Sequence, residues 1–191
     1  MPCAEESNEA LKEGLVQRLL RARTVLVNGE VDQEMAERVM AQLLVLDADS
    51  HEPIRVFVTS QGGHVDSGFA IADIMRFVES PIIAIGTGWV ASIAVPILLG
   101  ASKENRYALP NTRFLLHQPA GGAGGQVSDI RIEAQEIIRI RERVNRLIAE
   151  ETGQPIEKVA KDSDRNFWLT ADQAVEYGLI NKVITTPAEI G

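Results

Sequence analysis

A serine and a histidine near the middle of the chain have the chemistry of a nucleophile and its base. Ser92 lies in GTGWVASIAV, residues 86–95, directly after an apolar run, and His117 lies in the run RFLLHQP, residues 113–119. A serine hydroxyl becomes a nucleophile when a base takes its proton near neutral pH, and histidine is the side chain best suited to that role. Each residue also has a structural interpretation, the serine as a helix N-cap and the histidine as a hydrogen-bonded side chain. Considered singly, neither establishes catalysis.

The other histidines and the single cysteine point to little further chemistry. His51 lies in the polar turn DSHEP and His64 follows the glycines of QGG, so we interpret both as loop residues without a catalytic role. Cys3 stands alone, which excludes an internal disulfide and any zinc site built from several cysteines. We therefore expect neither a metal nor redox chemistry.

Two glycine-containing patterns around Ser92 suggest other enzymes, and both match poorly. Residues 86–91 fit the dinucleotide fingerprint G-x-G-x-x-A, in which glycines let a pyrophosphate approach a helix N-terminus. Trp89 is bulky for such a cradle, and no G-x-x-x-x-G-K-[ST] loop for nucleotide phosphates occurs in the sequence. The G-x-S-x-G turn of α/β-hydrolases is disfavoured, because Val90 and Ala94 take its glycine positions.

The composition is that of an ordinary globular protein with an acidic surface. The 191 residues are 45% hydrophobic and 24% charged, which suits one domain with a substantial core. Lys and Arg number 19 against 27 Asp and Glu, and the net charge of -8 disfavours binding to nucleic acid or anionic membranes. Residues 1–14 lack the basic start and apolar core of a secretory signal, and no apolar run approaches the roughly 20 residues of a membrane span. We expect a cytoplasmic protein with neither nucleic acid nor membrane as a partner.

Strand-like and helical patterns alternate along nearly the whole chain, which predicts an α/β domain with a largely parallel sheet. Strands are expected at residues 24–27, 54–60, 82–87, 106–110 and 113–119, and after Gly178. Helices are expected at residues 9–23, 33–48, 69–78, around Ser92, at 127–151 and after a Thr170 cap. Turns or loops are expected at residues 28–30 and 61–68. No linker or repeat interrupts the pattern, so residues 1–191 form one predicted domain, with about residues 1–14 as a flexible N-terminus.

The longest helical signal follows a glycine-rich stretch. AGGAGGQ, residues 120–126, must be either mobile or held in a backbone geometry that side chains would disfavour. Residues 127–151 then carry an apolar stripe at helical spacing, formed by Ile130, Ala134, Ile137, Val144 and Ile148. This helix would span about 37 Å, more than a domain of this size needs for its own core. We expect part of it to face a partner.

Several long motifs in one order resemble the ClpP family, the proteolytic subunit of the ATP-dependent Clp protease. They lie within residues 16–185 and include QRLLRARTVLVNGEV, SQGGHVDSGFAIADIM, LPNTRFLLHQPAGGAGGQVSDIRIEAQEI and DSDRNFWLTADQAVEYGLI. The resemblance implies an α/β fold of the ClpP/crotonase type, with repeated strand-strand-helix units and a protruding handle of a strand and a helix at about residues 120–151. It also implies self-assembly into heptameric rings stacked as a tetradecamer, and an AAA+ unfoldase as partner. ATP would bind to the unfoldase, so no cofactor is expected in this chain.

The resemblance assigns roles to both candidate residues. In ClpP proteins the serine of AS-x-[GA] is the nucleophile and the histidine of HQP is the base, which correspond here to Ser92 and His117. The family's oxyanion hole uses two backbone amides, which correspond to those of Gly63 and Ile93. Gln61 stands where the family has a proline, so we expect a less rigid loop beside the site.

The third catalytic position departs from the family. The family's D-R-D pattern ends in an aspartate, whereas this chain reads Asp164, Arg165, Asn166. An asparagine can fix the histidine tautomer but offers no negative charge to the imidazolium, and the same chemical change in another serine protease lowers kcat by about 10⁴. Asp164 and Arg165 resemble the family's pair that links the site to contacts between rings. Asp162 and Asp164 are also rival carboxylates, although a solvated acidic surface is the simpler interpretation of both.

The sequence therefore favours a serine endopeptidase subunit of a barrel-shaped, ATP-dependent Clp-type protease that degrades unfolded proteins to short peptides. We expect weak intrinsic activity, either in rings of one subunit or in rings mixed with a ClpP paralogue. One alternative is a non-catalytic subunit that serves assembly or regulation of a Clp complex. Another is a crotonase-fold enzyme acting on acyl-CoA, which is less favoured because its usual carboxylate base is not evident.

Overall fold

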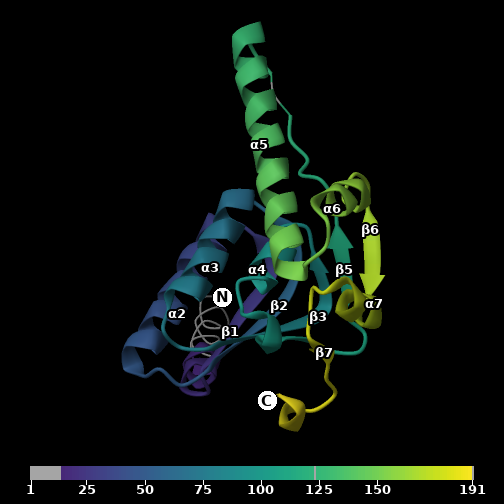
Figure 1. The fold of residues 1–191 in the computed structure, drawn as a ribbon. Coiled ribbons are helices and arrows are strands. Elements are labelled where there is room, and N and C mark those ends of the chain that lie inside the picture. Colours follow the sequence, from purple (N-terminus) through teal and green to yellow (C-terminus); the bar gives the residue numbers. More distant parts are fainter. Residues whose placement is uncertain (1–13, 123, 191) are drawn as a thin grey trace, which may run out of the picture.

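Short β-branched runs form a seven-stranded sheet in the computed structural model, which describes residues 14–122 and 124–190 (Figure 1). The strands are β1 (Thr24–Val31), β2 (Ile54–Gly63), β3 (Ile82–Ala91), β4 (Arg106–Ala108), β5 (Arg113–Leu116), β6 (Phe167–Thr170) and β7 (Lys182–Val183). Their order is β1-β2-β3-β4-β7, with β5 also paired to β3 and β6 paired to β5. All pairs are parallel except β5 with β6. The predicted α/β class with a largely parallel sheet is confirmed.

The long strands are bent, so each contributes two segments to the sheet. The pairing register shifts between Asn28 and Glu30 in β1 and between Val58 and Ser60 in β2. Beyond the bend, β3 changes partner: Ala84–Gly86 pairs with β4, whereas Trp89–Ala91 pairs with β5. Each bent strand followed by its helix corresponds to a strand-strand-helix unit, as predicted.

Two predicted interruptions are wrong. Residues 28–30 remain in β1, and of the expected loop at 61–68, the first three residues end β2 and the last four begin a helix. The glycine in NGE forms an irregularity inside the ladder and does not end the strand, which is how a bulge is accommodated. The G-x-G-x-x-A segment, residues 86–91, also does not end its strand, because it lies wholly within β3. It therefore forms no turn into a helix at which a pyrophosphate could bind.

The helices are α2 (Gln33–Asp49), α3 (Val65–Phe77), α4 (Ala94–Leu98), α5 (Val127–Thr152), α6 (Ile156–Asp162) and α7 (Ala171–Tyr177), and residues 14–21 are also helical. Side-chain caps explain several of the starts. Asp32 accepts a hydrogen bond from the Met35 amide at the start of α2, and Thr170 with Gln173 forms a capping box at α7, as the predicted Thr170 cap requires. The predicted flexible N-terminus, about residues 1–14, lies outside the described residues except for residue 14.

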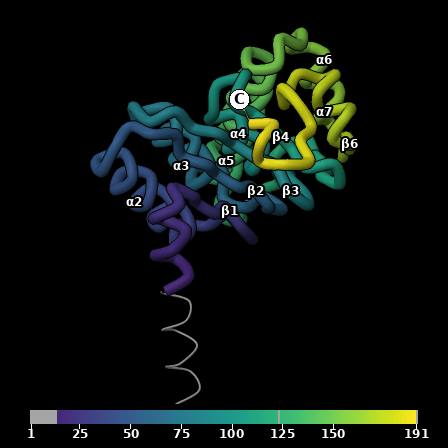
Figure 2. Tube along the Cα trace, turned by 90° about the horizontal axis from the view of Figure 1, so that it is seen from below, coloured from purple at the N-terminus to yellow at the C-terminus, as the bar shows by residue number. Residues whose placement is uncertain are grey.

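The sheet has apolar residues on both faces. In β3, Ile82 and Ala84 join the main core under α2, α3 and α4, while Ile83 and Ile85 point the other way and pack with Tyr107. This second cluster also contains Ile184 and the partly buried Phe57, Leu109 and Ile190. The C-terminal segment therefore covers the face that the helices leave open, and Figure 2 shows it lying beside β4.

Helix α5 projects far beyond the rest of the chain (Figure 1). Ile148 near its base is buried, whereas the distal Val127, Ile130, Ile132 and Ile138 are 41% to 76% exposed. The predicted long helix at residues 127–151 is therefore confirmed, whereas the partner that its apolar stripe is expected to face stays a prediction. The predicted strand before it is not confirmed, because residues 120–122 and 124–126 take no strand conformation and one chain offers them no neighbouring strand. Within the described ranges, no helix combines the length and apolar character needed to cross a membrane.

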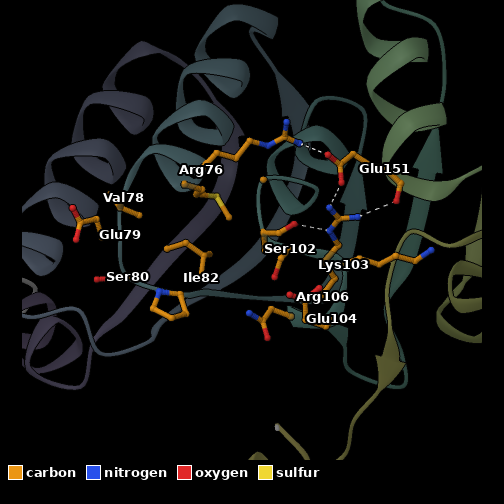
Figure 3. Close-up of a pocket in the computed structure, with 15 residues that line it drawn as sticks. Arg76, Val78, Glu79, Ser80, Ile82, Ser102, Lys103, Glu104, Arg106 and Glu151 are labelled. Atoms are coloured by element: carbon orange, nitrogen blue, oxygen red, sulfur yellow. Dashed lines mark hydrogen bonds and ion pairs between the residues drawn. The ribbon is translucent and has the colours of Figure 1, made fainter.

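A buried arginine anchors the base of α5 to the sheet (Figure 3). Arg106 of β4 is 1% exposed, and its guanidinium donates to the carbonyls of Leu99 at 3.1 Å and Ala101 at 2.8 Å. It also forms an ion pair with the Glu151 carboxylate in the last turn of α5. The other oxygen of Glu151 accepts from Arg76 of α3 at 2.8 Å. The Glu151 carboxylate thus joins the C-terminal ends of α3 and α5 to β4.

We predict that Glu151→Gln lowers the free energy of unfolding by about 3 kcal/mol, because the buried Arg106 loses its ionic partner. Urea unfolding at fixed protein concentration measures the change. The control is Glu150→Gln, which removes a charge from the exposed neighbouring position and should change stability by less than about 0.5 kcal/mol. Equal effects of the two changes would contradict an anchoring role for Glu151.

Candidate active site

Ser92 occupies a strained turn between β3 and α4. Its φ is 56°, in the left-handed region that non-glycine residues enter at a cost of about 1 to 2 kcal/mol. The Ser92 amide donates to the Leu115 carbonyl at 3.0 Å, and its own carbonyl accepts from the Val95 amide at 3.0 Å. The helix predicted around Ser92 begins only at Ala94, with Ile93 as its N-cap. Ser92 therefore stands on a tightly held turn and not inside a regular element.

The end of β2 lies directly against this turn. A Cβ on Gly62 would come 2.6 Å from the Cβ of Ser92 and 2.8 Å from the Ala91 carbonyl oxygen, so only glycine fits there. Gly63, the predicted oxyanion residue, follows at once and approaches the Val31 backbone just as closely. No role is predicted for Gly62 from the sequence, although the Gly-Gly pair is the signal that could have revealed this close approach.

The second predicted oxyanion amide, that of Ile93, follows Ser92 in the chain. Within the described residues it donates no hydrogen bond. A free amide beside a nucleophile is what an oxyanion hole requires, and the amide of Gly63 belongs to the strand end packed on the same turn. The Ile93 amide is adjacent to Ser92 in the chain, whereas Gly63 packs on the Val31 backbone, and the oxyanion role of both amides stays a prediction.

His117 and Asn166 are placed by the pairing of β5 with its two neighbours. Ala91 at the end of β3 is opposite Leu115, and Leu116 at the end of β5 is opposite Phe167 at the start of β6. His117 follows β5 directly, so the register puts it beside Asn166, which precedes β6, while Ser92 follows β3 on the other side of β5. Figure 1 shows β5 between β3 and β6. All three residues belong to the described part of the chain, and none of their side chains hydrogen-bonds another there. The register sets the three residues at the ends of neighbouring strands, and their catalytic roles stay a prediction.

A pocket of about 600 Å³ opens beside the histidine. His117 and Asn166 line it together with Asp164 and Arg165, and Ile137 of α5 forms its far wall. The glycine-rich segment also borders it, through residues 120–121. The pocket therefore lies between the end of β5 and the middle of the projecting helix. Ser92 is not among its lining residues.

The two rival carboxylates occupy different surroundings. Asp162 accepts hydrogen bonds from Lys158 at 2.8 Å and from the Tyr177 hydroxyl at 3.1 Å. Burial, together with this carboxylate, raises the pKa of Tyr177 well above its usual range. Asp162 is therefore engaged with α7, whereas Asp164 shares the pocket with His117. The predicted role of Asp164 and Arg165 in ring contacts stays a prediction, since it concerns a second chain.

The other two histidines have structural surroundings. The His64 ring lies 2.8 Å from the Ser67 hydroxyl and caps the start of α3. The exposed His51 ring lies 3.3 Å from Asp47, and hydrogen bonds from Ser80 hold the pKa of that carboxyl at about 2. Neither histidine reaches Ser92, as predicted. Within the residues that the structure describes, no cluster of three or more His, Cys, Asp or Glu is placed to hold a metal ion.

Comparison with known proteins gives consistent matches over almost the whole chain. Residues 7–187 match the family model described as Clp protease. The ATP-dependent Clp protease proteolytic subunit 3 of Rhizobium etli is 50% identical over 172 residues, covering 90% of this chain and 89% of the relative. The proteolytic subunit 2 of Pseudomonas aeruginosa is 50% identical over 185 residues, covering 97% and 92%.

Two solved structures of ClpP1 from Listeria monocytogenes resemble the fold. A mutant in which an asparagine is replaced by aspartate superposes with a TM-score of 0.86, and the unmodified protein with 0.84. Each is 50% identical to this chain, and each match covers 93% of this chain and 99% of the other. The similarity therefore extends to both sequence and three-dimensional arrangement.

We predict that Gly62→Ala displaces the Ser92 turn. Gly29→Ala is the matched control, because both glycines have a φ near 95° but only Gly62 has neighbours within reach of a new Cβ. Both variants bear backbone strain, and Gly62→Ala should lose roughly a further 1 to 3 kcal/mol of unfolding free energy from overpacking. Labelling of Ser92 by a fluorophosphonate probe should slow in Gly62→Ala alone. Equal stability and equal labelling of the two variants would show that β2 does not shape the turn.

Proposed function

Because the chain belongs to the Clp protease family, we propose that it is a serine endopeptidase subunit of an ATP-dependent Clp-type protease. Ser92 is the nucleophile, His117 the base and Asn166 the residue that orients the base. The observation that supports this assignment is the pairing of β5 with β3 and β6, because these three strands are the ones after or before which His117, Ser92 and Asn166 stand in the chain. The substrates are unfolded polypeptides, cut to short peptides.

The proposed reaction follows from the groups around the Ser92 turn. His117 takes the hydroxyl proton as the Ser92 oxygen attacks the carbonyl carbon of the scissile peptide bond, and the amides of Gly63 and Ile93 bind the resulting oxyanion. His117 then donates the proton to the leaving amine, and a water molecule hydrolyses the Ser92 ester by the same exchange. Asn166 can fix the histidine tautomer but cannot neutralise the imidazolium, so intrinsic activity is low.

We further propose that the chain works in heptameric rings stacked as a tetradecamer, of this subunit alone or mixed with a ClpP paralogue. The exposed distal stripe of α5 supports this, because apolar side chains that one chain leaves in water favour burial against another. The glycine-rich segment at residues 120–126 would gain its strand partner in the assembly, and Asp164 with Arg165 would contact the second ring. An AAA+ unfoldase in the cytoplasm would deliver substrate and bind the ATP, so this chain needs no cofactor.

Ser92→Ala tests the assignment directly. We expect it to abolish both hydrolysis of a small fluorogenic peptide and labelling by a fluorophosphonate, while the native mass stays unchanged. The assay is run with and without candidate paralogue and unfoldase. Hydrolysis that survives the change would refute Ser92 as the nucleophile. A wild-type protein that is never labelled, even with partners present, would favour a non-catalytic ring subunit.

Asn166→Asp tests the third position. Since the reverse change costs another serine protease about 10⁴ in kcat, we expect at least a tenfold rise in kcat/KM for the fluorogenic peptide. KM should change little, because Asn166 acts on the base and not on bound peptide. Asn181→Asp, an exposed substitution of the same kind beyond α7, is the control and should leave the rate unchanged. A flat response to Asn166→Asp would place this residue outside the site.

A further inference from the structure

Two tryptophans and an arginine form an exposed patch on the outer face of the sheet. Trp89 of β3 is opposite Arg113 of β5, and the Arg113 guanidinium lies 4.8 Å from the centre of the Trp168 ring of β6. The residue after each of the three is in the core, so their own side chains point to the outer face. The two indoles are 39% and 41% exposed. Aromatic side chains and arginine are the residues that protein contact surfaces favour. We call these three residues the indole patch.

A leucine-lined pocket lies at the opposite edge of the same sheet. β1 is the outer strand on this side and β6 the outer strand on the other, and Figure 2 shows them on opposite sides of the chain. Helix 14–21 and β1 border a pocket of about 310 Å³, which a large apolar side chain can enter. We call it the leucine pocket. Its apolar lining is Leu15, Val16, Leu19, Leu20 and Leu26.

We propose that the indole patch of one copy docks on the leucine pocket of the next, and that this is the side-to-side contact within each ring. A patch and a pocket at opposite edges of one chain make a heterologous contact, and repetition of such a contact can close into a ring. The inference rests on the proposed function, because the ring is part of that proposal. It concerns neighbours in one ring, whereas Asp164 and Arg165 are proposed to contact the second ring.

The strand register puts the two surfaces at the same level of the sheet. Asn28 of β1 is opposite Thr59 of β2, and Trp89 of β3 stands level with Thr59, because the residues that follow these two are paired. Arg113, opposite Trp89, therefore lies in about the same row as Asn28. Copies placed side by side so that each continues this row bring the indole patch of one to the β1 edge of the next.

The charges along this row favour a second copy as the occupant. Glu30 follows Asn28 by two residues and is exposed, and it points to the outer face because Val31 is in the core. Within the described parts of the chain, neither Glu30 nor Arg113 forms an ion pair. Continuation of the row brings Arg113 of one copy towards Glu30 of the next. Complementary charges at the edge of an apolar contact help to fix its register.

A charge placed on either surface should break the rings. We expect Trp168→Lys and Leu26→Lys each to reduce the native mass from that of the rings to that of single chains or pairs, with unchanged circular dichroism. The control is Ile156→Lys at the start of α6, outside both surfaces. Ile156 is 42% exposed, against 41% for Trp168 and 40% for Leu26, and its variant should keep the rings. Intact rings in both test variants, or equal loss in the control, would overturn the inference.

Cross-linking tests the pairing itself, in the native assembly of a Cys3→Ser chain that has no other cysteine. With a short bismaleimide, Leu26→Cys combined with Trp168→Cys should give a ladder of joined chains that ends at the ring. Either cysteine alone should give none, because a heterologous contact does not bring two copies of one residue together. Joined pairs in a single-cysteine variant, or intact rings without a ladder in the double variant, would refute the contact. So would a ladder that forms only with an added paralogue and joins this chain to it.

Failure of the proposed function gives a different result. Hydrolysis that persists after Ser92→Ala would remove the serine mechanism and leave the native masses and the cross-linked ladder as they are. Loss of the ladder with hydrolysis that still depends on Ser92 would remove the inference and keep the function.

Discussion

The pairing register of one four-residue strand determines the arrangement of the whole site. β5 lies between β3 and β6, and its backbone hydrogen bonds with each fix which residues of those strands stand opposite its own. A shift of one residue in either pairing would turn His117 to the other face of the sheet, into the core. The buried Phe114 and Leu116 prevent that shift, since their side chains fill the core face. The packing of Phe114 and Leu116 in the core thus determines where His117 lies on the opposite face of the sheet.

The sequence was informative wherever a local pattern carries the signal. The run RFLL and the histidine after it, the long helix beginning at residue 127 and the Thr170 cap all follow from periodicity or capping, and all appear close to their predicted bounds. The left-handed backbone of Ser92 could not be predicted, because it depends on β2 and β5 packed on both sides of the turn. The change of partner along β3 was missed for a similar reason. No local sequence pattern predicts which strand will pair with each part of β3.

The contacts of the acidic side chains at residues 162 and 164 also could not be predicted from the sequence. Asp162 and Asp164 are two residues apart, yet Asp162 accepts a hydrogen bond from Tyr177 of α7, whereas Asp164 lines the pocket that also holds His117. The open geometry of the site has a related origin. Ser92, His117 and Asn166 come from three strand ends, and the pocket lined by His117 and Asn166 also borders Gly121 and Ile137 of α5.

One end of α5 is held rigidly, because Glu151 in its last turn forms ion pairs with Arg76 and Arg106. The helix is 26 residues long and about 39 Å from end to end, and only its last turns, around Asn145 to Thr152, are buried in the body of the chain. Because Glu151 is held by ion pairs to Arg76 and Arg106, the last turn of α5 cannot rotate freely. A sideways force on the tip of the helix is therefore transmitted to β4 and to the end of α3. Since β4 and β5 both pair with β3, a load on the tip of α5 would reach the strand that precedes Ser92.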